Sequence, residues 1–388
     1  MCCITRTAER DGSLSGEHGR VIRWLGTCQV FFFLFGGILA GPLTDRFGPQ
    51  LLLVTGAFLS SLGCAASSFA GQFWFFLGTQ GVLLGMGASL GFTPAIACIM
   101  QCIGSRRATC VGVALSGASA GAILWPVVVR IIAETKAWKI VWLALAVSQL
   151  LLLSVAALLV RQPSILLSSA SQARQDYSPL VRSSSERSRP FLNLAVFSLP
   201  SYALSIAGHF FIWVGFLYLF FYLPEWTNLS GISVAVQIHM PSIISGSAFV
   251  GNLLLPFLAD VTGRYEIMVL CAFSGSVSLL GSILVRNPTA LLLVAGIYGF
   301  TTGGAIALQA PVLVEAIDEP EAFGTVLGQG LAAIAPAALI GPPLYGLILR
   351  APEGGLACAQ VVAGFCMVIG GILLIYARLC LGRTFSHG

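Results

Sequence analysis

Acidic and basic side chains are sparse in this sequence, and two aspartates recur in the same setting. One belongs to Gly41-Pro-Leu-Thr-Asp45-Arg46-Phe-Gly48 and the other to Leu258-Ala-Asp260-Val-Thr-Gly263-Arg264. Each aspartate stands three residues before a glycine, between two long apolar segments. A carboxylate at a membrane edge can accept hydrogen bonds from the free N–H groups of a neighbouring helix N-terminus, which carries partial positive charge. The alternative is a turn carboxylate that caps its own loop.

His209 is the ionisable residue that lies deepest in an apolar segment. Ionisable residues inside a membrane usually mark function. His209 could therefore contact a proton or a ligand, and the alternative is a packed ring that is bonded to a neighbour. Buried amides and aromatic side chains could line a path through the protein or simply pack between helices. The complete set of path candidates is Gln29, Gln80, Trp125, His209, Tyr218, Asn252, Tyr298 and Gln309.

Other kinds of chemistry find little support in the sequence. No cluster of His, Cys and carboxylate residues has catalytic or metal-binding spacing, so neither an enzyme nor a metal site is indicated. The eleven cysteines have no repeated spacing and are mostly inside apolar segments, as small core residues are. The net charge of +5 is spread over connecting segments, which argues against a nucleic-acid-binding patch.

The surroundings of these residues are unusually apolar. Between Phe47 and Ser105 the chain runs 59 residues without Asp, Glu, Lys or Arg, enough for two membrane crossings of about 20 residues each. Charged residues make up 9% of the chain, against about 25% in soluble domains. Because lipid cannot hydrogen-bond a backbone, repeated stretches of this kind predict membrane-spanning helices. Charges and turn residues divide the chain into eleven predicted spans, at 24–43, 50–69, 73–101, 108–130, 139–160, 200–222, 233–258, 267–285, 289–314, 322–349 and 354–377.

The predicted spans fall into two groups. Five precede and six follow a Ser- and Arg-rich linker at 161–190, which predicts helical bundles at 24–160 and 191–380 between tails at 1–23 and 381–388. If the two aspartate motifs are equivalent, the second group has a helix before its motif that the first group lacks. The simplest account is two six-helix halves with the opening helix missing, because residues 1–23 are polar.

Basic residues predict the orientation. If the aspartate motifs, the linker and the carboxyl tail share one side, that side holds eleven arginines and the other holds five arginines or lysines. Segments rich in Lys and Arg face the cytoplasm, so we expect the linker to be cytoplasmic. The amino tail then falls on the outer side with four arginines. A lost first helix would explain this misfit.

The motif Gly41-x-Leu-x-Asp45-Arg46-x-Gly48 resembles the signature of the major facilitator superfamily between its second and third helices. The second aspartate motif and the central linker strengthen this resemblance. At a finer level, residues 24–380 resemble the monocarboxylate-transporter-like branch, especially its fungal members. The matching segments begin at Gln80, Arg106, Ser116, Phe221, Phe257, Gly324 and Gly341.

The resemblance implies an all-α integral membrane protein with the major facilitator fold, which moves a small molecule through a lipid bilayer, in the plasma membrane. It implies alternating access and no cofactor, with possible proton coupling, while the oligomeric state is left open. It also implies that Asp45 contacts the helix that begins near Ala322, with Arg106 or Arg107 as a further partner. Such a contact would form a conformational latch, whose candidate residues are Gly41, Asp45, Arg46, Gly48, Arg106, Arg107, Asp260, Gly263 and Arg264.

The substrate that the resemblance favours is a small organic acid such as a monocarboxylate. The sequence departs from the animal carriers, because its first helix lacks a basic residue and Gly251 and Leu255 stand near the positions of their Asp/Arg pair. A weakly charged, aromatic path suits the efflux of a fungal secondary metabolite as well. The third possibility is a truncated relative that does not transport and acts as a sensor or is inert.

Overall fold

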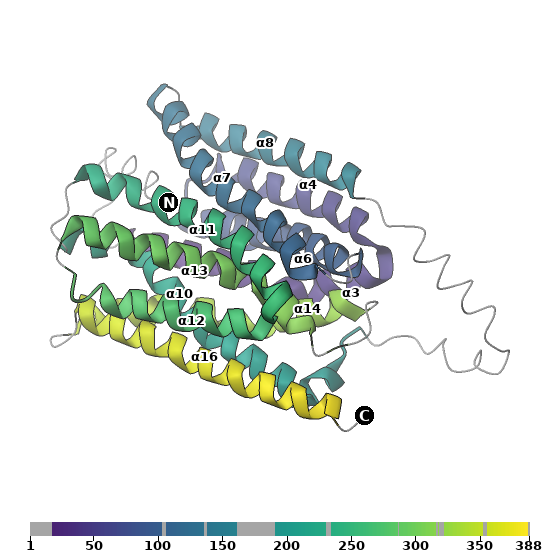
Figure 1. Ribbon diagram of the computed structural model, residues 1–388. Coiled ribbons are helices and arrows are strands. Elements are labelled where there is room, and N and C mark those ends of the chain that lie inside the picture. The colour runs from purple at the N-terminus through teal and green to yellow at the C-terminus, as the bar shows by residue number, and fades with distance from the viewer. Residues whose placement is uncertain are drawn as a thin grey trace.

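The computed structural model is helical throughout its regular structure (Figure 1). It describes residues 18–102, 106–135, 138–160, 191–229, 234–285, 287–315, 317, 322–351 and 355–386. Most of the predicted amino tail, from residue 1 to 17, and the predicted linker at 161–190 lie outside the described residues. The prediction of an all-α chain is confirmed.

The predicted spans correspond one by one to helices or to runs of consecutive helices. The first group is α2 (His18–Phe35) with α3 (Gly37–Phe47), α4 (Pro49–Ser67), α5 (Phe73–Phe76) with the π-helix η1 (Leu77–Leu83) and α6 (Leu84–Cys102), α7 (Arg107–Thr135) and α8 (Trp138–Leu159). After the 3-10 helix η2 (Leu194–Ser198), the second group is α10 (Pro200–Leu229), α11 (Val234–Thr262), α12 (Arg264–Gly281), α13 (Pro288–Val314), α14 (Phe323–Ile334) with α15 (Pro336–Ile348), and α16 (Leu356–Ser386).

Ten of these spans are long and apolar enough to cross a membrane within the described part of the chain. The eleventh, α12, has 18 residues and is less apolar because Arg264 and Glu266 lie in its first turn. Three boundaries differ notably from the prediction. Helix α2 begins at His18, inside the predicted polar tail, α10 continues to Leu229, and α16 continues to Ser386, because helical hydrogen bonding does not stop at the edge of an apolar segment.

The two aspartate motifs are helix ends rather than the loops that the sequence predicted. Asp45 lies in the last turn of α3, and Asp260 lies in the last turn of α11. Each helix is separated from the next by a single glycine, Gly48 with φ of 81° and Gly263 with φ of 130°. Glycine adopts positive φ without the steric cost that other residues meet there. One residue therefore makes the whole turn and fixes the aspartate at its place.

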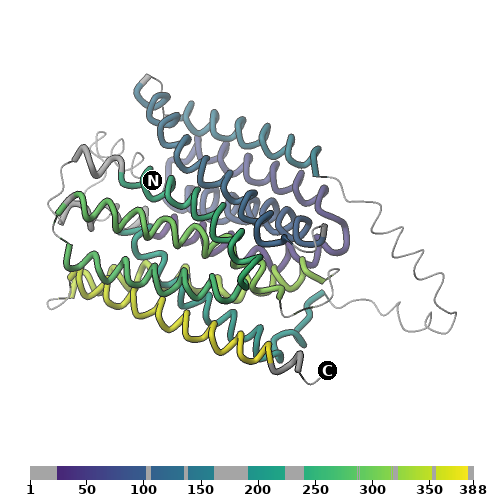
Figure 2. Tube along the Cα trace, viewed as in Figure 1, coloured from purple at the N-terminus to yellow at the C-terminus, as the bar shows by residue number. Residues whose placement is uncertain are grey.

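The helices form two bundles, which are shown with the same viewpoint in Figures 1 and 2. In the N-terminal bundle α4 packs against α6 and α8, and in the C-terminal bundle α16 packs against α10 and α12. The two most extensive contacts between the bundles are those of α3 with α14 and of α7 with α11. We call the end of the molecule where α3 and α11 terminate the aspartate end, which is at the right in Figure 1.

Small residues allow the helices of these two pairs to approach closely. A Cβ added to Gly41 would run into the carbonyl oxygen of Gly324, and one added to Gly37 would lie 2.8 Å from the carbonyl oxygen of Gly328. In the other pair, a Cβ on Gly112 would meet the carbonyl oxygen of Asn252. Backbone contact of this kind is a common basis of helix association in membranes, where the hydrophobic effect does not drive it.

The two bundles differ in how well their helices are covered. In the C-terminal bundle α10 packs against α16 and α15, and the most apolar windows of the spans 323–348 and 356–382 are 50% and 44% buried. The equivalent spans of the N-terminal bundle are α7 and α8, and each is 22% buried. Within the described residues, no helix packs against both α7 and α8 as α10 packs against both α15 and α16.

Close packing of α3 on α14 leads to a test with an internal control. We expect Gly37→Leu to destabilise the folded protein by about 1–3 kcal/mol, as overpacking usually does, and to lower its melting temperature in detergent. Gly117→Leu adds the same side chain to α7, where nothing lies within 4 Å of the added Cβ. This control should melt like the wild type, and equal melting of both variants would contradict the close packing.

Candidate functional site

Asp45 accepts hydrogen bonds from the first turn of α14, a helix of the other bundle. The backbone N–H of Gly324 lies 3.1 Å from Oδ1, and the backbone N–H of Thr325 lies 2.6 Å from Oδ2. The hydroxyl of Thr325 also donates to Oδ2, at 2.7 Å. Gln101 of α6 donates to Oδ1 from 3.4 Å. The carboxylate thus caps a helix that is 279 residues away along the chain.

Asp260 repeats this arrangement in the opposite direction. Its Oδ1 accepts from the backbone N–H of Ala108 at 3.2 Å, and its Oδ2 accepts from the backbone N–H of Thr109 at 2.7 Å. The Thr109 hydroxyl donates to Oδ2 at 2.7 Å. Here a carboxylate of the C-terminal bundle caps α7 of the N-terminal bundle. We call these two sets of contacts the aspartate caps.

Both caps use the electrostatics of a helix N-terminus. The first N–H groups of a helix have no partner within the helix, and a negative charge is favourable beside them. The side chain of Asp260 is 5% exposed, so little water competes for its oxygens. A hydrogen bond to a charged group contributes about 1.5–3 kcal/mol, which makes each cap a substantial link between the bundles.

The predicted arginines of this region have different partners. Arg264 lies 3.5 Å from Oδ1 of Asp260 and supports the second cap. Arg106 or Arg107 was expected as a further partner of Asp45. The guanidinium of Arg107 lies over the ring of Phe323, 5.0 Å from the ring centre, beside the residue that donates to Asp45. Arg46 lies over the ring of Phe191 at 5.2 Å, and Arg106 is exposed.

An apolar cluster between the bundles, here called the interbundle core, adjoins the two caps. Its residues from the N-terminal bundle are Leu34, Ile96, Met100, Val111 and Leu115. The C-terminal bundle contributes residues of α10, α13 and α14, among them Tyr202, Ala310, Phe323, Val326 and Leu331. The hydroxyl of Tyr202 donates to the carbonyl of Val326 at 2.7 Å, so this buried polar group is satisfied. Caps and core together hold the bundles against each other at the aspartate end.

A group of charged residues lies beside the second cap. Arg378 of α16 pairs with Glu266 of α12 at 2.9 Å. Glu315 follows the last residue of α13, and its Oε2 is buried without a hydrogen-bond partner among the described residues. Burial raises the pKa of Glu315, while Arg264 and Arg378 oppose this shift. The neutral, protonated form of Glu315 is therefore favoured relative to an exposed glutamate.

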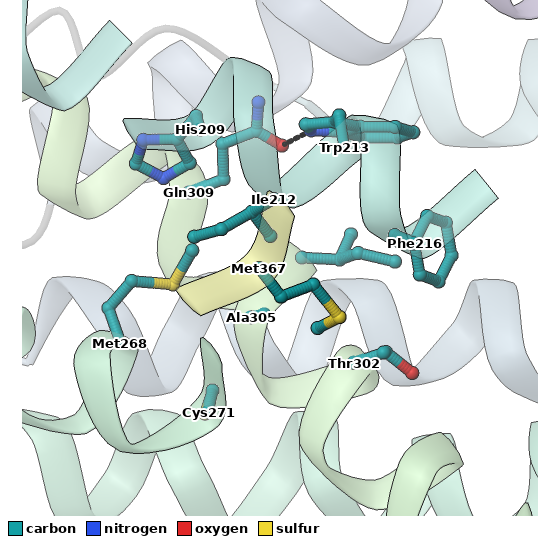
Figure 3. Close-up of a pocket in the computed structure, with 11 residues that line it drawn as sticks. His209, Ile212, Trp213, Phe216, Met268, Cys271, Thr302, Ala305, Gln309 and Met367 are labelled. Carbon is teal, nitrogen blue, oxygen red and sulfur yellow. Dashed lines mark hydrogen bonds between the residues drawn. The ribbon is translucent and has the colours of Figure 1, made fainter. Parts of the chain in front are cut away.

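The predicted path residues do not gather in one place. Two of them, His209 and Gln309, lie together at a small cavity inside the C-terminal bundle (Figure 3). The cavity has a volume of about 20 Å³, which is large enough for one water molecule. The cavity is lined by His209, Ile212, Trp213, Phe216, Met268, Cys271, Thr302, Ala305, Ile306, Gln309 and Met367.

The other path candidates serve as links between helices or are buried elsewhere. Asn252 donates to the carbonyl of Leu115 at 3.3 Å and to Oγ of Ser119 at 2.9 Å, which joins α11 to α7. Tyr298 donates to the carbonyl of Phe216 at 3.0 Å and joins α13 to α10. The ring centre of Tyr218 lies 5.1 Å from that of Tyr345. Gln80 is buried in the π-helix η1, whereas Gln29 and Trp125 are half-buried.

Two functional residues were missed by the sequence reasoning, Thr109 and Thr325. Each is near the start of a long helix, where a Thr hydroxyl often takes part in helix capping. A search for Thr in the first turn of the helix facing each aspartate would have found both. The aspartates themselves were recognised because the motif is repeated.

The chain resembles known membrane proteins over most of its length. Residues 13–342 match the family model described as Major Facilitator Superfamily. The aspyridones efflux protein apdF of Emericella nidulans is 26% identical over 369 residues, which are 94% of this chain and 71% of that protein. The agnestins efflux protein AgnL12 of Paecilomyces divaricatus is 26% identical over 378 residues, which are 97% and 82% of the two chains.

The fold of this chain also resembles the folds of solved structures. The proton:xylose symporter XylE, bound to 6-bromo-6-deoxy-D-glucose, superposes with a TM-score of 0.73 at 18% identity, over 96% of this chain and 87% of that one. The human organic anion transporter MFSD10 gives a TM-score of 0.63 at 19% identity, over 92% and 83% of the two chains. At such identities the likeness concerns the fold alone.

The buried carboxyl of Glu315 predicts a pH dependence of stability. Because its pKa is raised in the folded protein, the fold binds this proton more tightly than the unfolded chain does. The contribution of protonated Glu315 to the free energy of unfolding is complete at pH values below the ordinary pKa of about 4.3. This contribution is lost as the pH rises through the raised pKa of Glu315. We expect the melting temperature of Glu315→Gln, relative to the wild type, to increase over this rise in pH. A constant difference between the two melting temperatures would contradict the shift.

Proposed function

Because this chain belongs to the major facilitator superfamily, we propose that it is a secondary-active transporter that exports a secondary metabolite by alternating access. Two relatives that cover most of the chain are named efflux proteins for aspyridones and agnestins, and a third is a fujikurins efflux protein of Gibberella fujikuroi, 26% identical. None of these names refers to a monocarboxylate. The relatives therefore favour efflux over the uptake of a small organic acid.

The distribution of charge supports a weakly charged substrate. Within the described residues, the Asp, Glu, Lys and Arg side chains lie at or near the ends of the spans, as Asp45, Glu134, Asp260 and Glu315 do. A small carboxylate crossing the bilayer would need a fixed positive charge to replace its hydration. A neutral or amphipathic metabolite would need only aromatic and apolar surfaces with a few hydrogen-bonding groups.

The aspartate caps carry the proposed mechanism. Both caps and the interbundle core lie at one end of the bundles, so that end is closed. Basic residues predict that this end faces the cytoplasm, and the state would then be closed toward the cytoplasm. To open it, the carboxylates of Asp45 and Asp260 must leave α14 and α7. Each released carboxylate and each freed N–H would be hydrated, which limits the free energy of opening to an amount that ligand binding can supply.

The same geometry gives the two caps equal roles. Asp45 belongs to the N-terminal bundle and binds the C-terminal bundle, while Asp260 does the reverse. Rigid rotation of one bundle against the other would break both caps in one movement. The close glycine contacts of α3 on α14 provide the surface about which the bundles would rock.

Metabolite profiling tests the proposed export. We expect a strain that lacks the gene to retain a secondary metabolite inside the cells, and an overexpressing strain to enrich the same compound in the medium. A small organic acid that is consumed more slowly by the deletion strain would instead support uptake. Unchanged profiles in both strains would contradict transport and favour a sensor or inert relative. A variant Asp45→Ala, expressed at the same level, controls for indirect effects of overexpression.

Weakening a cap should change turnover more than substrate affinity. We expect Asp45→Asn and Asp260→Asn to lower the transport rate several-fold in vesicles, because loss of the charge disturbs the balance between the two end states. The substrate concentration for half-maximal transport should change less than the maximal rate. Thr325→Val, which removes one hydroxyl donor to Asp45, should give a smaller effect in the same direction. Unaltered turnover of both Asn variants would refute the role of the caps.

A further inference from the structure

The cavity inside the C-terminal bundle contains an unusual polar group. His209 is 1% exposed and lies on α10, and residues of α12, α13 and α16 line the cavity together with it. Its Nδ1 is 2.7 Å from the carbonyl oxygen of Ser205. Since a carbonyl oxygen can only accept, Nδ1 carries the proton and Nε2 presents a lone pair. Nε2 is buried without a hydrogen-bond partner, and this edge of the ring is directed into the cavity (Figure 3).

The other groups around the cavity are neutral. Trp213 donates its indole N–H to Oε1 of Gln309 at 3.1 Å, whereas Nε2 of Gln309 has no partner. The Thr302 hydroxyl bonds to the carbonyl of Tyr298 at 2.7 Å. Besides His209, the titratable group that lines the cavity is Cys271 of α12, and Tyr265 lies nearly two turns earlier on that helix. No carboxylate lines the cavity.

A polar connection leads from His209 toward the aspartate end. The backbone of Ser205 holds the imidazole, and the hydroxyl of the same residue lies 2.8 Å from that of Tyr265. Tyr265 lies in the first turn of α12, and its hydroxyl is also 3.5 Å from the carbonyl oxygen of Val312. His209 is thus separated from the membrane edge by hydroxyl groups and not by an entirely apolar layer.

We propose that His209 is the proton-binding site that couples this carrier to a proton gradient. This inference rests on the proposed function. Water that enters the cavity brings a hydronium ion, and Nε2 takes a proton from it, which leaves a water molecule and an imidazolium. The imidazolium keeps its bond from Nδ1 to Ser205. Release of the proton to water reverses the step. The described spans contain no carboxylate away from their ends, so His209 is the group in their interior whose side chain can take up a proton from water.

Protonation would also alter the contacts of the cavity. Nε2 becomes a donor, and one side-chain oxygen at the cavity, Oε1 of Gln309, already accepts from Trp213. A protonated His209 would compete with Trp213 for this oxygen. Trp213 adjoins both the interbundle core and the core of the C-terminal bundle. The competition therefore connects the charge of His209 to the packing that closes the aspartate end.

Nuclear magnetic resonance can observe the proton directly and needs no substrate. The chain has four histidines, so full-length protein labelled with 15N-histidine in lipid nanodiscs gives few side-chain signals, and His209→Gln identifies the one of interest. We expect the His209 signal to show the Nδ1–H tautomer at high pH and a second, reversible N–H as the pH falls from about 8 to about 4, which brackets the histidine range. A ring that keeps one proton throughout, while the other histidines titrate, would overturn the proposal.

Transport by His209→Asn separates the proton site from a structural role. An Asn amide can still donate to the Ser205 carbonyl but cannot take up a proton in this range. With the metabolite that the profiling identifies as the probe, we expect vesicles with this variant to transport it down its own gradient, while stimulation by an imposed pH gradient is lost. Equal stimulation of the variant and the wild type would overturn the proton site and leave the proposed export standing. If the wild type itself exports nothing, the proposed function fails, and the resonance experiment still decides whether His209 binds a proton.

Discussion

The structure depends on the pairing of a partly buried carboxylate with the N-terminus of a helix from the opposite bundle. Asp45 and Asp260 are each bound by two backbone N–H groups and one Thr hydroxyl. A carboxylate in this position neutralises the exposed donors of a helix that would otherwise end against apolar surface. Because the relation is reciprocal, neither bundle can move away without exposing both its own aspartate and its own helix start.

Packing and electrostatics act at the same end of the molecule. Backbone contact between α3 and α14 requires glycine on both helices, at Gly37 and Gly41 and at Gly324 and Gly328. This contact brings the last turn of α3 close enough for Asp45 to reach α14. The interbundle core fills the space between the bundles beside the caps. The polar groups of the caps can be hydrated when the bundles separate, and an interface of this kind suits a protein that must open and close it.

Much of the fold could be predicted from the sequence, because charge-free segments leave a backbone no alternative to membrane-spanning helices. The repeat of Asp45 and Asp260 also revealed the two halves. What could not be predicted was the local geometry. The motifs were expected to be loops, yet a glycine at positive φ makes a turn in one residue, and composition does not distinguish the two cases. Thr109 and Thr325 were missed because their partners are remote in sequence.

The path residues were harder to predict for a related reason. Asn252 and Tyr298 are polar residues of apolar helices, and their direction depends on how each helix is rotated about its axis. The structure uses both as links between helices, to α7 and α10. His209 and Gln309 differ because the four helices around them leave a space. Such a space results from the packing of many side chains and has no signature in a single segment.

Distances measured by double electron–electron resonance across the aspartate end give the most direct test of whether the two caps hold the bundles together. Leu51 of α4 and Val261 of α11 are 57% and 74% exposed, one on each bundle beside a cap, and spin labels there in a cysteine-replaced background would report the separation. The reciprocal caps predict one short distance in the wild type and an added, longer population in the double variant Asp45→Ala with Asp260→Ala. An unchanged distance distribution in the double variant would contradict the claim that the two carboxylates hold the bundles together.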